Sequence, residues 1–538
     1  MKQLVRNGTI ITGSGRTGAL AVLDGSVVAS GDEALEWSTS WDEVIDLEGG
    51  TAIPGFRDGH VHPYSGGTKS VMLNLFGLRS ISEIQDALRR WSRDHPGDGW
   101  IEGNGYDPTL LPGSVGDASW LDAAVADRPV ALHSTDYHMM WVNSAALDAS
   151  GITVDTPDPE LGTIVRRADR TPVGTLYEFG AMALVERCLP PLSDAQQMQA
   201  LVAAMGALTA NGIVWAQDAA VKPDDVALHV RGAHAGFITC RLNMAWQADP
   251  KAWTRQRASF LEGRASLRAD DVASRWLTAD TVKFFADGVI EAGTGFLLEP
   301  YEGQPGCCGL PNWSAEGLQE AVRAFDADGF QIHVHAIGDG GVRMALDAIE
   351  HAARLNGPRD RRPVIAHTQL VHPDDHRRFA ELGVIANFEP LWACLDQSQV
   401  ELTQPRLGPA RSALQYPIES MRRAGARISF GSDWPVSSIT PLHGLAVAVT
   451  RQNDSGEPVS GWVPDERVPV TDALAAYTSG SAYQAFDDDR GTLDVGRRAD
   501  FCVLETDITA LSGRDIADVP VVRTYLAGIA AGRGISGE

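Results

Sequence analysis

Basic residues are scarce in this sequence. Lysine and arginine together number 45, against 70 aspartates and glutamates, so the formal net charge is −25. Because nucleic acids and anionic membranes are bound through basic patches, this balance argues against both as partners. It does not argue against a small-molecule partner, since a cleft carries its own local charge.

Cysteines are also few, and their spacing indicates no pairing. The six cysteines, at positions 188, 240, 307, 308, 394 and 502, form no CxxC motif. Adjacent Cys307 and Cys308 cannot easily bridge each other. We therefore expect reduced thiols, as in a cytoplasmic protein.

Long apolar runs are missing. The first residues, MKQLVRNGTIITGSG, contain no apolar core of the length found in signal peptides. No run elsewhere reaches the roughly 18 residues that a membrane-spanning helix needs. The sequence therefore predicts a soluble intracellular protein.

The length and the two chain ends indicate more than one domain. The chain has 538 residues, too many for one ordinary core. Both ends read as short strands separated by glycine turns, and pairing them would bring the termini together. We predict a small β-sandwich domain made from residues 1–54 and 485–538, and a main domain over 55–484.

The middle of the chain alternates apolar, β-branched runs with helical patterns such as LQEAVRAFDADG and VRMALDAIEHAARL. Eight such strands with intervening helices predict an α/β fold, a closed (β/α)8 barrel of the TIM type. The expected strands lie at 52–62, 212–219, 238–245, 281–288, 331–338, 363–370, 383–390 and 427–435.

A barrel of this type needs about 250 residues, and this one spans far more. The excess lies mainly at about 64–205, which we predict to be an inserted cap over the carboxyl ends of the strands. Tryptophans in the cap either line an apolar pocket or fill the cap core, and core is the expected use of most. These residues are Trp91, Trp100, Trp120 and Trp141.

Ionisable side chains interrupt several of these apolar strands. His60 and His62 are two residues apart, so on a strand both point to the same face. Alone, this pair is weak evidence. Four further residues of this kind follow, and buried ionisable groups are unfavourable unless they are paired or bound to metal. They are Lys283, His335, His367 and Asp433.

Imidazole and carboxylate ligands suit Zn²⁺, and also Fe²⁺, Mn²⁺ or Co²⁺. Lysine is the exception, because an ammonium with a pKa near ~10.4 cannot bind a cation. Lys283 is therefore neutral, displaced, or carbamylated by CO2 into an anionic ligand that would bridge two metals.

These residues, in this order on successive strands, resemble the amidohydrolase superfamily. More narrowly, the chain resembles its branch of YtcJ-like proteins and N-substituted formamide deformylases. The C-terminal GTLDVGRRADFCVL resembles the closing β-domain of the superfamily. The branch is marked by IPGFRDGHVH, DRPVALHSTDYHMMWVNSAAL, GTLYEFGAMALV, VKFFADGVIEAGTG, HVHAIGD, IAHTQLV and GSDWPV.

The resemblance implies one or two divalent metals per chain, with zinc as the expected ion. His60, His62 and Asp433 would hold one metal, and the carbamylated Lys283 would bridge it to a second. His335 and His367 would hold that second metal. His335 is preferred to His333 because it matches the HAIGD motif, although spacing alone does not exclude His333, which shares its strand face.

The expected reaction is hydrolysis of an amide-type C–N bond other than a peptide bond. N-substituted formamides, related amides and cyclic amides are the expected substrates. A divalent metal would activate the water, and Asp433 would act as general base and then as general acid. Ester, lactone or phosphotriester hydrolysis stays open, as do decarboxylation, isomerisation and a non-catalytic binding or scaffold descendant of the fold.

Candidate substrate contacts come from motifs around the expected site. His138 and Glu178 belong to cap motifs, and each has a structural alternative of about equal weight. Asp287 and Asp339 could also orient ligand imidazoles. The remaining candidates are Tyr106 and Trp434, for which core packing is the alternative.

The chain departs from the branch in two places. Asp136-Tyr137-His138 stands where the family often has DGH, and Val289–Gly293 replaces a small polar run. Both departures leave the expected metal site intact and the substrate open. A homodimer is the default expectation for the oligomeric state.

Overall fold

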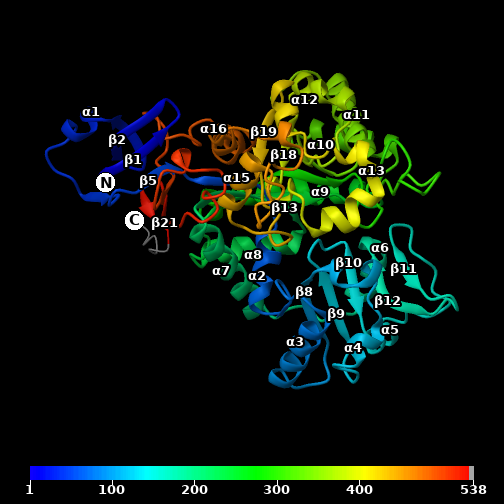
Figure 1. Cartoon of the computed structure of the whole chain (residues 1–538). Coiled ribbons are helices and arrows are strands. Elements are labelled where there is room, and N and C mark those ends of the chain that lie inside the picture. Colours follow the sequence, from blue (N-terminus) through cyan, green and yellow to red (C-terminus); the bar gives the residue numbers. More distant parts are fainter. Residues whose placement is uncertain (532–538) are drawn as a thin grey trace.

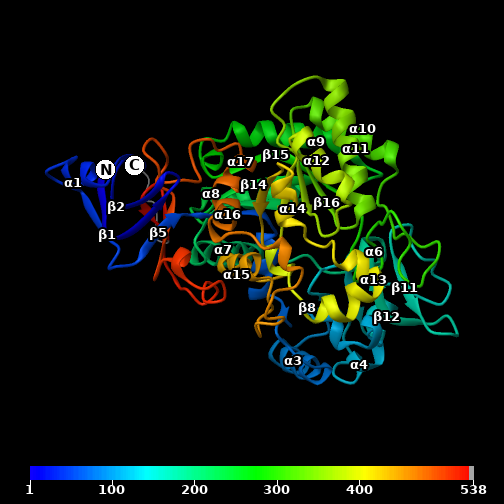
Figure 2. The same ribbon diagram turned by 45° about the horizontal axis from the view of Figure 1, so that its top comes forward.

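The computed structural model describes residues 1–531 and contains three β-sheets. One sheet is a parallel barrel, the second is built from both chain ends, and the third belongs to the inserted cap. In Figures 1 and 2 the barrel lies between the terminal sheet and the cap. Residues 532–538, the end of the predicted β-sandwich domain, lie outside the described residues.

The barrel has eight parallel strands that follow one another in chain order, and all eight predicted strands are present. The α/β class and the TIM-type barrel are therefore confirmed. The strands are β6 (Phe56–Val61), β13 (Ile213–Val221), β14 (Arg241–Gln247), β15 (Leu277–Phe285), β16 (Gln331–Ala336), β17 (Val364–His367), β18 (Ile385–Phe388) and β19 (Arg427–Phe430).

The first predicted strand, at 52–62, is two strands rather than one. β5 (Thr51–Pro54) pairs in the terminal sheet, whereas β6 enters the barrel. Gly55 separates them at a point where a Cβ atom would lie 2.5 Å from Val214 Cγ1. The close approach of strand β13 at this position therefore requires a glycine.

Helices cover the barrel strands. In α10, Leu318, Val322 and Phe325 recur on one face and are buried in the barrel core. The sequence pattern predicted both this helix, α10 (Ala315–Ala327), and the next one, α11 (Asp339–Asn356). The helices outside the cap are α2 (Pro63–Gly67), α7 (Asp194–Ala210), α8 (Pro223–His234), α9 (Trp253–Arg268), α10 (Ala315–Ala327), α11 (Asp339–Asn356), α12 (His376–Leu382), α13 (Gln404–Ser412), α14 (Ile418–Arg423), α15 (Pro441–Thr450), α16 (Val470–Ala475) and α17 (Ser481–Gln484).

Hydrogen bonds between β6 and the segment after β19 close the barrel. Asp433 N donates to His60 O at 2.7 Å, and His62 N donates to Trp434 O at 2.8 Å. The buried Asp58 carboxylate accepts from Ser432 N at 3.0 Å and from Ser432 Oγ at 2.6 Å. Chain segments more than 370 residues apart in the sequence are thereby held in one register.

The terminal sheet contains strands from both chain ends, as predicted. Its strand order is β22-β21-β20-β5-β1-β2-β3, and β4 also pairs with β1. The halves of the predicted sandwich are thus parts of one connected sheet, while the domain limits stay predictions. The strands are β1 (Lys2–Thr12), β2 (Gly15–Leu23), β3 (Ser26–Ser30), β4 (Glu43–Asp46), β5, β20 (Phe501–Leu504), β21 (Val521–Leu526) and β22 (Ile529–Ala530), and helix α1 (Asp32–Glu36) follows β3.

The cap is built on a six-stranded sheet within the predicted insertion, 64–205. The insertion also contains α7, which packs in the barrel core through Leu201, Met205 and Leu208. The cap strands are β7 (Leu73–Asn74), β8 (Ile101–Tyr106), β9 (Val130–Ser134), β10 (Met139–Val142), β11 (Thr163–Arg166) and β12 (Pro172–Tyr177), and the cap helices are α3 (Ile81–Asp94), α4 (Ala118–Asp122), α5 (Ser144–Ala149) and α6 (Glu178–Glu186).

The four cap tryptophans serve the cap core rather than a pocket. Trp141 is fully buried, and Trp91 and Trp120 pack against the same cluster. Trp100 packs against the second cap cluster. All six cysteines are free thiols, and among residues 1–531 no helix is long and apolar enough to cross a membrane.

The barrel closure gives a prediction about stability. Ser432→Ala removes two interactions of one hydroxyl and leaves the buried Asp58 carboxylate with one acceptor bond fewer. We expect the free energy of unfolding to fall by about 1–3 kcal/mol, measured by urea denaturation. Ser150→Ala is the matched control, because the Ser150 hydroxyl is buried and has no hydrogen-bond partner among the described residues. Equal stability of the two variants would contradict this role of Ser432.

Candidate metal centre

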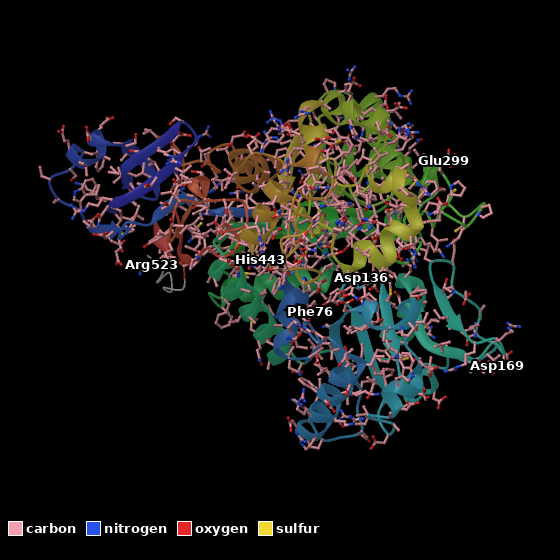
Figure 3. All side chains as sticks on the ribbon, viewed as in Figure 1. Phe76, Asp136, Asp169, Glu299, His443 and Arg523 are labelled. Atoms are coloured by element: carbon pink, nitrogen blue, oxygen red, sulfur yellow. The ribbon has the colours of Figure 1, made fainter. Side chains whose placement is uncertain are left out.

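A cavity of about 1020 Å³ opens at the carboxyl ends of the barrel strands, between the barrel and the cap. Its wall includes five of the six predicted ligands, and the sixth, Lys283, lies fully buried beside them. Figure 3 shows Asp136 at the junction of cap and barrel, with Asp169 at the far end of the cap. The predicted metal ligands that line the cavity are His60, His62, His335, His367 and Asp433.

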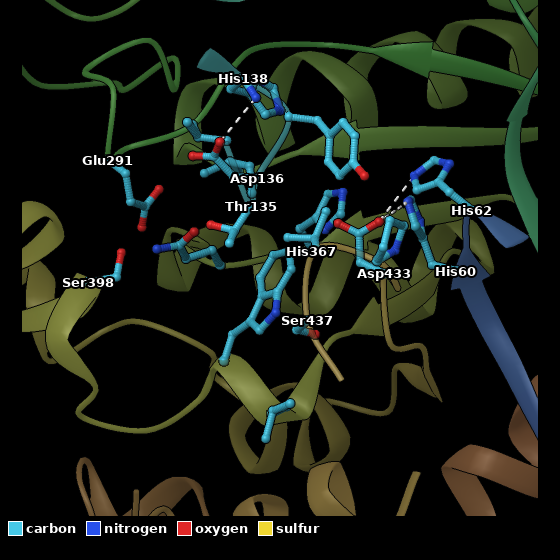
Figure 4. Close-up of a pocket in the computed structure, with 18 of the residues that line it drawn as sticks. His60, His62, Thr135, Asp136, His138, Glu291, His367, Ser398, Asp433 and Ser437 are labelled. Carbon is cyan, nitrogen blue, oxygen red and sulfur yellow. Dashed lines mark hydrogen bonds and ion pairs between the residues drawn. The ribbon is translucent and has the colours of Figure 1, made fainter. Parts of the chain in front are cut away.

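Strand β6 and the segment after β19 contribute the first group of ligands (Figure 4). His62 Nε2 lies 3.1 Å from Asp433 Oδ1, and His60 Nε2 lies 3.6 Å from the same oxygen. One ligand atom from each of the three residues lies within 4.8 Å of the others. The barrel closure places them together, because Asp433 is hydrogen-bonded through its backbone to His60.

The second group comes from the middle strands of the barrel. Lys283 Nζ, at the end of β15, lies 3.3 Å from His60 Nε2. The His335 and His367 rings lie 4.5 Å apart between centroids, and His367 lies 4.6 Å from the His60 ring. The structure therefore brings all six predicted ligands into one cluster.

Burial makes the bases of this cluster harder to protonate. It lowers the pKa of Lys283 to about 7 and that of His367 to about 3. Burial, with the neighbouring bases, also lowers the pKa of His60 and of His335 well below the usual range. Burial opposes ionisation of Asp433, but the ion pair with His62 outweighs burial and lowers the pKa of Asp433. Neutral imidazoles beside a carboxylate are the form in which these groups bind metal.

Hydrogen bonds to the outer ring nitrogens orient three of the imidazoles. His60 Nδ1 lies 2.9 Å from His333 Nε2, and His367 Nδ1 lies 2.9 Å from Glu389 Oε2. His335 Nε2 lies 3.1 Å from the Gly288 carbonyl oxygen. Each ring thus has its other nitrogen free for the centre, which is the usual arrangement of metal-binding histidines.

Two of these orienting residues were not selected from the sequence. His333 lies behind His60 and outside the cavity wall, whereas His335 lines it, so the structure favours the predicted choice between them. Glu389 is fully buried at the end of β18. It is an ionisable residue in an otherwise apolar strand, so the rule that selected Lys283 and Asp433 also applies to it.

Backbone strain is concentrated at the same centre. His367 has φ +73° and Asp433 has φ +52°, a left-handed conformation that is uncommon for residues with a Cβ atom. Such outliers persist where the surrounding structure holds them, and they cluster at functional sites. Here the barrel and its closure hold both ligand residues.

Of the predicted substrate contacts, only His138 reaches the cavity wall. Its Nδ1 lies 2.9 Å from Glu178 Oε2, so Glu178 stands behind it as an orienting partner. Burial opposes protonation of His138, but the Glu178 carboxylate outweighs burial and raises the pKa of His138 to about 9. The cap therefore presents an imidazolium to the cavity.

Tyr106, Asp287 and Trp434 do not line the cavity. Tyr106 is fully buried in the cap core, and Trp434 packs against Gly66 in the barrel core. The Asp287 carboxylate accepts backbone hydrogen bonds from Phe296, Ile337 and Gly338, and its Oδ1 also lies 3.8 Å from His335 Nε2. Tyr106 and Trp434 are packed in cores, which is the alternative expected for them from the sequence. Asp339 likewise accepts from Leu298 N.

The donor set fits a divalent metal. Asp433 Oδ1 is buried and makes no hydrogen bond among the described residues, although it faces the His60 and His62 imidazoles. A buried carboxylate oxygen without a donor is unfavourable, and a cation among these ligands would satisfy it.

The cavity wall is strongly acidic. Among residues 1–531, and apart from the histidines, Lys222 is the single basic side chain of this wall, and no arginine lines it. Because like charges repel in a partly enclosed cleft, the wall disfavours an anionic ligand outside the centre. The acidic residues beside Asp433 are Asp107, Asp136, Asp218, Asp225, Glu291, Asp396 and Asp454.

Comparison with known proteins agrees with this geometry. The model of the amidohydrolase family matches residues 43–529. Protein LONG AFTER FAR-RED 3 of Arabidopsis thaliana is 31% identical over 97% of this chain and 87% of its own length. Putative amidohydrolase YtcJ of Bacillus subtilis is 29% identical over 97% of both chains.

A further relative and a solved structure extend the comparison. The N-substituted formamide deformylase of Arthrobacter pascens is 26% identical over 90% of this chain and 89% of its own length. An uncharacterized metal-dependent hydrolase of Pyrococcus horikoshii has the same fold, with a TM-score of 0.75 at 23% identity over 95% of this chain and 99% of its own.

The orienting role of Glu389 gives a prediction about metal affinity. Glu389→Gln replaces the carboxylate that fixes His367 with a neutral amide, so we expect the metal dissociation constant to rise about 10–100-fold. Competition with a chromophoric chelator measures it. Glu419→Gln is the control, because this buried carboxylate is paired with Arg422 and Arg423 outside the cavity wall. We expect Glu419→Gln to lower the stability of the protein without changing its metal affinity. Unchanged metal affinity in Glu389→Gln would refute the orienting role of Glu389.

Proposed function

We propose that this chain, which belongs to the amidohydrolase family of metal-dependent hydrolases, hydrolyses an amide-type C–N bond. The observation that carries the proposal is the single cluster formed by the six predicted ligands at the cavity. Similarity to an N-substituted formamide deformylase supports a formamide or a related amide as substrate.

The residues divide naturally into two metal-binding groups. His60, His62 and Asp433 would hold one divalent ion, which we propose to be zinc, with iron, manganese or cobalt as alternatives. His335 and His367 would hold a second. When bound, the metal activates a water molecule and polarises the carbonyl of the substrate.

Lys283 would bridge the two groups as a carbamate. Its lowered pKa leaves much of the amine neutral near pH 7, and only the neutral amine attacks CO2. The nitrogen lone pair forms the N–C bond, one C–O π pair moves to oxygen, and the nitrogen loses a proton to solvent. The product carries one negative charge shared by two oxygens. Carbamylation thus replaces an amine, which repels a cation when it is protonated, with an anionic ligand.

Asp433 would carry the proton of the reaction. It is buried and ionised beside His62, so it can accept a proton from the attacking water and pass it to the departing nitrogen. His138, held by Glu178, faces the cavity from the cap and would bind the substrate through its free ring nitrogen.

The acidic wall narrows the class of substrate. Outside the ligand cluster the cavity wall carries more carboxylates than basic side chains, and the basic ones include Lys222 and the His138 imidazolium. Neutral or cationic N-substituents are therefore favoured over anionic ones.

A substrate panel tests this function. The metal-loaded protein should hydrolyse N-substituted formamides, with kcat/KM about tenfold higher for an ammonium-ended substituent than for a carboxylate-ended one of equal length. Added salt should shrink this difference. Ester hydrolysis without turnover of any amide, formamide or cyclic amide would contradict the proposal, and so would purification without stoichiometric metal.

Asp433→Asn is the matched variant for that panel. The amide keeps the size and one oxygen of the carboxylate but cannot accept the proton. We expect kcat to fall by about 10²–10⁴ while much of the metal is retained in elemental analysis. Retained activity would remove Asp433 from the role of base.

The state of Lys283 is measurable independently of turnover. Protein equilibrated with ¹³C-labelled bicarbonate and metal should show a carbamate carbon resonance, which is lost in Lys283→Arg because a guanidinium stays protonated. Lys222→Arg, at the rim of the same cavity, is the control and should keep the resonance. Absence of the signal from the wild-type protein would leave Lys283 as an unmodified amine and overturn the bridge.

A further inference from the structure

Tyr137 comes from the cap but lies at the barrel cavity. It occupies the turn between β9 and β10 and lines the cavity wall. The turn is well held: Tyr137 N donates to Ser134 O at 3.2 Å, and His138 N donates to Asp136 Oδ1 at 3.1 Å. Figure 4 shows Thr135, Asp136 and His138 of this turn at the same pocket as His367, Asp433 and His60.

The backbone of Tyr137 is strained. Its φ is +60°, in the left-handed region that glycine occupies freely and bulky side chains rarely adopt. Such a conformation costs on the order of 1–3 kcal/mol. A glycine would make the same turn without that cost, so the turn itself gives no reason for a tyrosine.

The Tyr137 hydroxyl has no partner. Its ring stacks against His133 with 5.7 Å between centroids, and its oxygen is buried without a hydrogen bond among the described residues. Burial, and then the charge of Asp433, raises the pKa of the phenol above its usual range. The cavity wall therefore contains a neutral O–H donor that lacks an acceptor, and the same wall contains Asp433, the carboxylate expected to carry the proton.

An amide substrate offers one good acceptor for this donor. The amide nitrogen has its lone pair delocalised, whereas the carbonyl oxygen accepts hydrogen bonds and gains negative charge as water adds to the carbon. Since Asp433 would deprotonate the attacking water, the reacting carbonyl must lie near Asp433, which lines the same cavity as Tyr137. A fixed donor there is favourable mainly in the transition state.

We propose that Tyr137 is a catalytic residue supplied by the cap, whose phenol donates a hydrogen bond to the oxygen of the scissile carbonyl. This inference rests on the proposed amide hydrolysis. The phenol stays protonated throughout and transfers no proton, so the role of Asp433 is unchanged. The strained turn is what brings the hydroxyl to the centre.

Tyr137→Phe tests this role, because it removes one oxygen atom and keeps the ring. On the best amide of the panel we expect kcat to fall by about 10²–10³, with KM changed far less. Metal content and unfolding temperature should stay as in the wild type. Calorimetry gives a readout apart from turnover. A phosphonamidate with the same N-substituent mimics the tetrahedral state, and it should bind Tyr137→Phe at least tenfold more weakly than the wild type. The product amine should bind both proteins equally well.

Tyr177→Phe is the matched control. Tyr177 is also a cap tyrosine, and its hydroxyl donates to Ser114 O at 3.3 Å, outside the cavity wall. It should keep the wild-type kcat and phosphonamidate affinity. Equal kcat in the wild type and Tyr137→Phe would overturn the role of Tyr137 alone, as would unchanged phosphonamidate binding. No amide turnover by the wild type would overturn the proposed function and this inference with it.

Discussion

Closure of the barrel is the constraint on which the centre depends. Asp58 and Ser432 tie the first strand to the segment after the last one, and backbone hydrogen bonds join His60 to Asp433 and His62 to Trp434. The same contacts that complete the barrel therefore place two imidazoles and a carboxylate within ligand distance of one another. Gly431 is part of this closure, because a Cβ atom there would lie 2.7 Å from His60 N. A shift of register at this seam would separate the ligands.

Burial gives the cluster its chemical character. In water Lys283 would be a cation, and the histidines would be partly protonated at mildly acidic pH. Removed from water, these bases have lowered pKa values, while His62 keeps the neighbouring Asp433 ionised. His333, Glu389 and a loop carbonyl then select which ring nitrogen faces the centre. A cluster of weakened bases around an ionised carboxylate is electrostatically suited to binding a cation.

The cap completes what the barrel begins. The barrel provides the predicted ligands, but the cap also lines the cavity, through residues 107–109, Phe179 and the turn at 135–138. That turn presents an imidazolium, His138, and a neutral phenol, Tyr137, with Glu178 fixing the imidazolium. The carboxylates of the cavity wall act over a longer range and disfavour anionic substrates. The surface between cap and barrel is thus where a substrate would be selected, whereas the residues expected to bind metal all come from the barrel.

The sequence by itself determined the eight strands and the pairing of the chain ends. It also identified the six residues that cluster at the cavity, because ionisable residues in apolar strands are unfavourable without a partner. Glu389 follows the same rule, so the sequence could also have identified it. Alternation along a strand gives the face of a residue but not its depth in the barrel, so only the tertiary structure placed His335 at the cavity and His333 behind His60. Packing likewise removed Tyr106, Asp287 and Trp434 from the cavity wall and brought Tyr137 into it. These outcomes depend on distances between segments far apart in the chain, which no local pattern encodes.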